Sequence, residues 1–152
     1  MNKMYTLPLF LLAALVFGGC QEHDGSEDQL QECVDSFAVY YYNWHLDKAA
    51  RFCTADSRQW LQFAASNVHQ EDLDTLHNKA EDAQVEIGDI SQTDDNSATA
   101  EIHVSDFLQM DTIGQPPTLV DEADFTLQLV MEQGKWRVRM EGLPRSGKQS
   151  RD

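Results

Sequence analysis

The side chains of this 152-residue chain that could do metal or acid–base chemistry include five histidines and 26 acidic residues. Zinc sites on helices use two histidines four residues apart, because that spacing places both imidazoles on one face. His69 and His77 are eight residues apart, and His23, His45 and His103 are scattered. The chain also has no glycine-rich phosphate loop and no glycine-flanked serine. We therefore expect no metal site and no cofactor.

Cys20 is the cysteine best placed for a covalent modification. It follows a basic start at Lys3, an apolar run over 7–17 and two glycines. The run is too short for a membrane span, which needs roughly 20 residues, and the arrangement is typical of an export leader. We expect residues 1–19 to be a signal peptide that is cleaved between Gly19 and Cys20.

The motif Phe17-Gly18-Gly19-Cys20 resembles the lipobox of bacterial lipoproteins. The resemblance implies a diacylglyceryl group on the Cys20 thiol and a further acyl chain, such as palmitate, on the new amino terminus. Two or more acyl chains make membrane attachment effectively permanent. Gln21, where an inner-membrane retention signal has aspartate, favours the outer membrane, on its periplasmic face or at the cell surface. Ordinary secretion with Cys20 as a thiol is the alternative.

Two further cysteines, Cys33 and Cys53, fall on apolar faces of expected helices, beside Val34 and after Phe52. One alternative is that both are buried as small hydrophobic side chains. The other is a disulfide, which an exported protein allows and which would stabilise the fold by roughly 3 kcal/mol on the chain-entropy model. The sequence leaves both alternatives open.

Acidic side chains dominate the chain, whose formal charge is −15 at pH 7. Residues 20–134 hold 24 acidic and four basic side chains, whereas residues 135–152 hold two acidic and six basic ones. Nucleic-acid binding depends on lysine and arginine displacing counterions from phosphates, so we exclude nucleic acid as a partner. Residues 20–26 are expected to be a solvated acidic tether, and residues 144–152 a disordered basic tail.

Residues 26–80 have the three-and-four spacing of apolar side chains that predicts helices. The first helix should begin with a capping box at Ser26 and end near His45. Three shorter helices should follow over 48–53, 58–68 and 71–80. Asp47 should cap the first of these three.

From about Asp82 the apolar spacing changes to the alternation of β-strands. Alternating segments lie at 83–90, 98–105, 125–131 and 136–140. A bulge is expected at Gly88, and a long loop from Gln109 to Glu122, which contains Gly114 and two prolines. Helices followed by antiparallel strands predict an α+β fold, in which the amino-terminal helices pack on one face of a curved sheet of about four strands.

Two segments carry a second resemblance: SFAVYYYNWHLDKAARFCTADS, which begins at Ser36, and FTLQLVMEQGKWRVRM, which begins at Phe125. They are similar to the first helix and the closing hairpin of the nuclear transport factor 2-like superfamily, also called cystatin-like or SnoaL-like. The likeness covers residues 27–143 and implies a cone-shaped domain like that of small bacterial lipoproteins of unknown function. The superfamily includes isomerases, dehydratases and binding domains, so the fold does not choose an activity.

Tyr41 and Trp44 are the candidates for lining a pocket, because both should point into the cone. Isomerase-like members use a carboxylate that projects into an apolar cone. The expected inward faces of the last three strands have no carboxylate, and Asp106 and Glu132 fall at strand ends. We therefore expect a non-enzymatic domain, anchored in the cell envelope by acylated Cys20, that binds an envelope protein or a small apolar ligand through the cone opening.

The alternative is a pocket enzyme of the isomerase or dehydratase type on the same fold. It would use Tyr41 together with an acid of the expected loop, either Asp111 or Asp121. This hypothesis requires a titratable group buried in a cavity.

Overall fold

The computed structural model describes residues 27–110 and 114–147. The expected signal peptide, Cys20, the acidic tether and Ser26 lie outside these ranges, as do residues 148–152 of the expected tail, so these expectations stay predictions. Among the described residues, none of the helices is long and apolar enough to cross a membrane. The elements are, in chain order, α1 (Glu27–Tyr42), α2 (Leu46–Ala49), the 3-10 turn η1 (Ala50–Phe52), α3 (Arg58–Ser66), α4 (Gln70–His77), β1 (Gln84–Asp94), β2 (Ser97–Gln109), β3 (Thr118–Glu132) and β4 (Lys135–Arg139).

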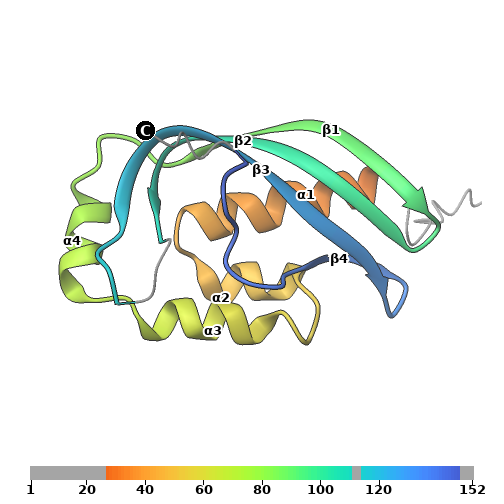
Figure 1. The fold of residues 1–152 in the computed structure, drawn as a ribbon, viewed down its shortest axis with the longest axis horizontal. Coiled ribbons are helices and arrows are strands. Elements are labelled where there is room, and N and C mark those ends of the chain that lie inside the picture. Colours follow the sequence, from red (N-terminus) through yellow and green to blue (C-terminus); the bar gives the residue numbers. More distant parts are fainter. Residues whose placement is uncertain (1–26, 111–113, 148–152) are drawn as a thin grey trace, which may run out of the picture.

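The four strands form one antiparallel sheet in the order β1-β2-β3-β4. The sheet is curved and arches over α1, while α2 and α3 lie below α1 and α4 lies at one end (Figure 1). Helix α1 contacts β1, β2 and β4, and α2 contacts both α1 and α3. The helices therefore cover one face of the sheet, which is the α+β architecture that the sequence predicted.

The core lies between α1 and the concave face of the sheet. On α1 the buried side chains are Leu30, Cys33, Val34, Phe37, Ala38, Tyr41 and Tyr42. Opposite them are Ala98, Ala100, Ile102, Val104, Phe125, Leu127, Leu129, Trp136 and Val138. Each large apolar side chain buried here contributes about 1.5–3 kcal/mol before conformational entropy is counted. The helical and alternating patterns therefore identified the buried faces correctly.

Helix α1 ends at Tyr42, before the expected end near His45, because Trp44 has a left-handed backbone with φ 61°. His45 N–H donates to Tyr40 O at 2.8 Å, and Trp44 N–H donates to Tyr41 O at 3.0 Å. This pair of bonds is a Schellman end, where glycine is the usual left-handed residue. The turn leaves His45 as the N-cap of α2. The prediction that Asp47 caps this helix was wrong, because Asp47 lies in the first turn of α2.

Asn43 ties the end of α1 to the start of the sheet. Its Nδ2 donates to Val39 O at 3.0 Å and to Ala83 O at 3.2 Å. Its Oδ1 accepts from Ala83 N–H at 2.8 Å. The amide therefore pairs with the backbone of Ala83 as a neighbouring strand would, and fixes where β1 begins.

The loop expected from Gln109 to Glu122 is much shorter, which corrects the prediction. Strands β2 and β3 pair almost to the end of the hairpin, with Leu108 opposite Leu119 and Gln109 opposite Thr118. The expected loop was inferred from glycine and two prolines, but those residues occupy only the tip. Cross-strand hydrogen bonds satisfy the backbone groups on either side, which a solvated loop would leave to water.

The bulge expected at Gly88 is present, because the β1–β2 register shifts between Ile87 and Ile90. A second irregularity lies at Asp106, whose φ is 53°. Strict alternation from Val104 would turn Asp106 toward the core. The left-handed backbone instead leaves Asp106 exposed and buries Phe107.

Candidate functional site

Tyr41 and Trp44, the predicted pocket residues, do line one cavity. Its other described walls are Tyr42, Leu46, Ala64, Leu108, Gln109, Met110 and Pro144. The volume that the centre of a water molecule can occupy in this cavity is only about 20 Å³. That volume has room for about one water. Tyr41 is 9% exposed and stacks on Phe37 at 5.6 Å between ring centroids. In this conformation the aromatic side chains fill the cone.

Trp44 combines an unfavourable backbone conformation with a hydrogen bond from its side chain. Its backbone lies in the left-handed region, which costs a non-glycine residue about 1–3 kcal/mol. Its indole Nε1 donates to Leu108 O at 3.0 Å and so links the end of α1 to β2. Trp44 therefore closes this end of the cone.

Tyr42 carries the one buried side-chain N or O atom without a hydrogen-bond partner among the described residues, its hydroxyl oxygen. The ring packs against Phe107 and Phe125, at 5.3 and 5.0 Å between centroids. Burial raises the pKa of Tyr42 well above its usual value, with a smaller contribution from Tyr41. The phenol therefore stays neutral and can act only as a hydrogen-bonding group.

Of the two acids considered for an enzyme, Asp121 does not line this cavity. Asp121 is an exposed residue of β3, and Asp111 lies outside the described residues. Glu132 accepts weakly from Ala55 N–H, at 3.3 and 3.4 Å. The described lining of the Tyr41 cavity contains no carboxylate.

Cys33 and Cys53 are both buried, free thiols. Cys33 Sγ lies 3.5 Å from Phe52 O, and Cys53 Sγ lies 3.5 Å from Ala50 O. Burial raises the pKa of Cys33 to about 12 and also raises that of Cys53. Of the two alternatives that the sequence left open, the structure has the buried thiols and not the disulfide.

His103 forms a polar cluster on the outer face of the sheet. Its Nδ1 lies 2.7 Å from Asp124 Oδ1, and its Nε2 lies 3.6 Å from Glu122 Oε2. The hydrogen bond to Asp124 raises the pKa of His103. Within residues 27–110 and 114–147, no group of three or more His, Cys, Asp or Glu side chains is arranged to hold a metal ion.

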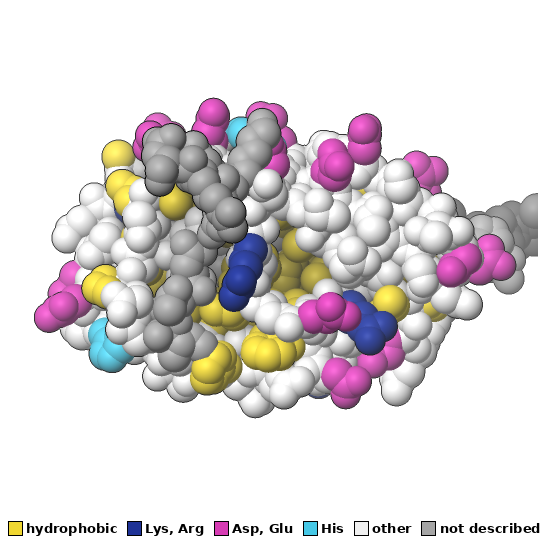
Figure 2. Space-filling model, in the orientation of Figure 1, with side chains coloured by type: hydrophobic (Ala, Val, Ile, Leu, Met, Phe, Trp, Pro, Cys, Tyr) yellow, Lys and Arg dark blue, Asp and Glu magenta, His cyan; other side chains and the backbone are white. Residues whose placement is uncertain are grey.

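A wide groove with a volume of about 690 Å³ lies between α3, the edge of the sheet and residues 140–145. We call it the α3–β4 groove. It is lined by Trp60, Phe63, Thr126, Leu127, Gln128, Val138, Arg139, Met140, Glu141, Gly142, Leu143, Pro144 and Arg145. Figure 2 shows apolar side chains in a hollow at the middle of this face, with basic side chains beside it.

The groove exists because β4 is much shorter than β3. Their pairing starts at Gln128 opposite Arg139, so the edge of β3 before Gln128 has no β4 residue beside it. Residues 140–145 leave the sheet there, and Gly147 N–H donates to Asp124 O at 3.1 Å. The groove therefore opens where the last strand stops.

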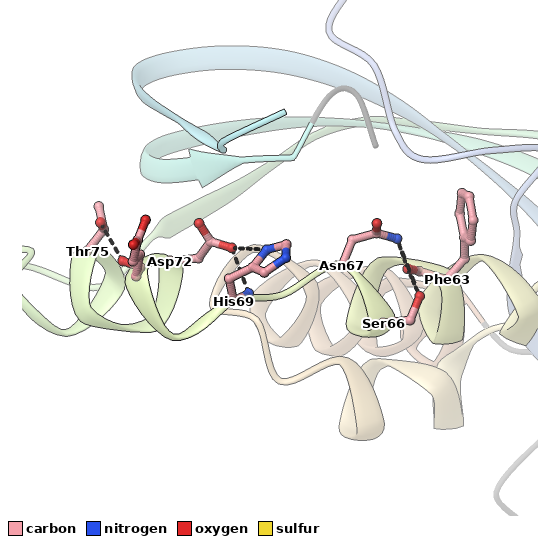
Figure 3. Close-up of polar contacts among 7 residues, drawn as sticks. Phe63, Ser66, Asn67, His69, Asp72 and Thr75 are labelled. Carbon is pink, nitrogen blue, oxygen red and sulfur yellow. Dashed lines mark hydrogen bonds and ion pairs between the residues drawn. The ribbon is translucent and has the colours of Figure 1, made fainter. Parts of the chain in front are cut away.

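Helix α3 supplies the aromatic wall of the groove. Trp60 and Phe63 lie 6.5 Å apart between ring centroids, and Phe63 is 42% exposed. The Phe63 carbonyl accepts from Ser66 Oγ at 2.8 Å and Asn67 Nδ2 at 2.7 Å, which caps the helix while the ring stays on the open side (Figure 3). Our sequence reasoning missed Phe63, although an aromatic residue off the apolar stripe of 58–68 was a usable signal.

Buried hydrogen bonds fix the position of Met140 in the groove. Its N–H donates to Ser57 Oγ at 2.7 Å, and Ser57 Oγ lies 2.6 Å from Thr54 Oγ1. Thr54 N–H in turn donates to Val138 O at 2.9 Å. These buried bonds join the start of α3 to the end of β4 and so hold the two walls together.

No family model matches this sequence, and no curated protein sequence is similar to it. The fold is similar to that of an NTF-2-like protein of unknown function from Shewanella oneidensis, with a TM-score of 0.50 and 10% identity, over 73% of this chain and 92% of that one. A function-unknown protein from Mycobacterium tuberculosis is less similar, with a TM-score of 0.45 and 12% identity, over 80% of this chain and 72% of that one. A candidate polyketide cyclase from Xanthomonas campestris has a TM-score of 0.36 and 12% identity, over 75% of this chain and 91% of that one. The curved sheet over α1 is therefore an NTF-2-like α+β fold, which by itself indicates no activity.

Proposed function

We propose that this protein is a non-enzymatic binding domain that holds an elongated apolar carboxylic acid in the α3–β4 groove. The observation that carries the proposal is the open groove of about 690 Å³, a volume typical of small-molecule sites. Trp60, Phe63 and Leu143 offer it an apolar wall, whereas the Tyr41 cavity has room for about one water.

Two arginines favour an acidic end on the ligand. Arg139 and Arg145 line the groove beside Glu141, and neither arginine has a carboxylate partner within 4.0 Å among the described residues. A guanidinium binds a carboxylate through two parallel hydrogen bonds. In a chain with 26 acidic and 11 basic residues, two unpaired arginines beside an apolar wall favour an anionic, amphipathic ligand.

We further propose that the domain is a lipoprotein of the outer membrane, anchored through acylated Cys20. The apolar run, the two glycines and the cysteine of the amino-terminal segment support this proposal. An anchored domain would meet its ligand, or an envelope protein that delivers it, at the membrane. We propose no nucleic-acid partner, because nucleic-acid binding depends on many lysines and arginines along the phosphate backbone and the net charge of this chain is −15.

The binding proposal is tested by titrating the exported Cys20→Ser chain with dodecanoate and, in parallel, with dodecanol. At about 0.3 kcal/mol per heavy atom, dodecanoate should bind with a Kd of about 1 mM or tighter. Phe63→Ser should weaken both ligands, whereas Arg145→Gln should weaken only the acid, by about tenfold. Arg58→Gln, on the same helix as Phe63 but outside the groove, is the matched control. Equal weakening of acid and alcohol by Arg145→Gln would contradict the proposed orientation, and no binding of either would contradict the site.

The anchor is tested by the intact mass of the protein from a membrane fraction. The expected mass lacks residues 1–19 and carries acyl groups that the Cys20→Ser chain lacks. A soluble, unacylated chain would exclude the anchor and leave the groove proposal unaffected.

A further inference from the structure

A second cleft lies at the other end of β4, between the first turns of α1, the turn η1 and the start of β4. Its volume is about 300 Å³, and it shares no lining residue with the α3–β4 groove. It is lined by Gln29, Glu32, Cys33, Arg51, Phe52, Lys135, Trp136 and Arg137. We call it the basic cleft, because three of its side chains are cationic.

The concentration of positive charge in this cleft is unusual for the chain. Residues 27–110 and 114–147 contain eight lysines and arginines, and three of the eight line the basic cleft. None of Arg51, Lys135 and Arg137 has a carboxylate partner within 4.0 Å in the described ranges. Acids outnumber bases by 26 to 11 in the sequence, so unpaired cations gathered in one place are not explained by a shortage of acids.

Two of these side chains, Lys135 and Arg137, have surroundings that leave most of their donors unused. Lys135 lies opposite Glu132 in the β3–β4 register, but the Glu132 carboxylate turns to Ala55 N–H, at 3.3 and 3.4 Å. Arg137 Nη1 donates to Trp136 O at 3.1 Å, and this uses one of the five guanidinium donors. The remaining donors of both side chains are available to a ligand.

The backbone holds the cations together. Lys135 and Arg137 are two residues apart on β4, so they share one face, while Trp136 points into the core. A parallel bridge between Cys53 and Val138 keeps η1, and with it Arg51, beside β4. The backbone positions of all three residues are therefore set by β4 and by the bridge that joins it to the segment after η1.

The other groups in the cleft offset only part of the positive charge of the three cations. Burial raises the pKa of Cys33 to about 12, although the nearby charge of Arg137 acts in the opposite direction, so the thiol stays neutral. Glu32, on α1, is the one acid in the lining. Three cations and one carboxylate leave the described lining with a net positive charge inside a protein of charge −15.

We propose that the basic cleft binds a phosphate group, with Arg51 and Arg137 as bidentate donors and Lys135 as a third positive charge. Arginine forks match the geometry of phosphate oxygens, and lysine supplies a point charge. The phosphate comes either from a soluble phosphate ester or from a lipid headgroup. The lipid source rests on the proposed anchor, because the seven peptide units between Cys20 and Glu27 span at most about 25 Å and would keep the domain close to the membrane.

The first arm of the test titrates the exported Cys20→Ser chain with inorganic phosphate and with glycerol 3-phosphate, followed by amide and arginine side-chain NMR shifts. Saturable shifts are expected at Arg51, Lys135 and Arg137. Arg137→Gln should weaken binding by about tenfold or more, and Lys48→Gln, a surface cation outside the cleft, should not change it. Glu32→Gln should tighten binding, a gain that a folding defect cannot produce.

The second arm measures sedimentation of the same chain with phosphatidylglycerol vesicles, with phosphatidylcholine vesicles as the comparison. Saturable binding of soluble phosphate alone assigns the site to a soluble ester. Binding to vesicles that Arg137→Gln abolishes assigns it to a headgroup. The proposal is overturned if neither arm detects binding, if Lys48→Gln weakens binding as much as Arg137→Gln does, or if Glu32→Gln leaves the affinity unchanged.

Discussion

Removal of the Ser57 hydroxyl should destabilise the whole domain, because this group joins the helices to the end of the sheet. Ser57 is 0% exposed and accepts from Met140 N–H at 2.7 Å. In Ser57→Ala the Met140 N–H is left buried without an acceptor, which costs about 1–3 kcal/mol, and the lost Thr54–Ser57 bond adds about 1 kcal/mol. The expected loss is about 2–4 kcal/mol, or about 4–16 °C in Tm for a chain of this size.

The assay is urea unfolding followed by far-UV circular dichroism. The midpoint should fall while the denaturant slope stays constant, because the unfolded state is unchanged. Ser91→Ala, which removes an exposed hydroxyl on β1, is the control and should change stability by less than about 0.5 kcal/mol. A double variant with Thr54→Val should cost less than the two single changes added, because the two hydroxyls share one bond. A Ser57→Ala midpoint equal to that of the control would refute this account of the junction.

Three further predictions concern Tyr42, Asn43 and His103. Tyr42→Phe removes a buried hydroxyl that has no partner among the described residues, so unfolding should require the same free energy or about 1–2 kcal/mol more; a loss above 1 kcal/mol would reveal a hidden partner such as a water. Asn43→Ala leaves Ala83 N–H without its acceptor, so stability should fall by about 1–3 kcal/mol and hydrogen exchange at Ala83 should accelerate; an unchanged exchange rate would contradict this. Protonated His103 is stabilised by Asp124, which raises its pKa above the usual value of about 6.5. That stabilisation is complete below about pH 6.5 and is lost as the pH rises through the folded-state pKa. NMR titration should therefore give His103 a raised pKa that Asp124→Asn returns toward the usual value, and a value unchanged by this substitution would contradict the assignment.

Much of the fold could be predicted from the sequence because it follows from local periodicity. The buried residues from Leu30 to Tyr42 repeat every three to four positions, and those from Ala98 to Val104 alternate. Both patterns agree with the buried residues of the structure, because each is the side-chain period of one regular element. The Gly88 bulge was predictable for the same reason, since the alternation changes phase at that glycine.

Boundaries set by long-range pairing were harder to predict. The extent of β2 and β3 depends on cross-strand pairing such as that of Gln109 with Thr118, and the sequence of neither strand shows this pairing by itself. The left-handed backbones at Trp44 and Asp106 also end or redirect elements, and a bulky residue such as Trp44 is rarely found in that conformation. Their cost is met by tertiary contacts such as Trp44 Nε1 to Leu108 O.

The sequence by itself determined the α+β class, the faces that form the core, the acidic character of the domain and the expectation of an acylated Cys20. Tertiary structure decided where a ligand has room. The residues predicted to line a pocket, Tyr41 and Trp44, close against their neighbours, because aromatic rings at helical spacing pack well in a core. The two sites proposed for ligands lie at the two ends of β4, and they arise from a mismatch in strand length and from the approach of η1 to a strand edge. Such sites join residues far apart in the chain, so only the packing of whole elements creates them.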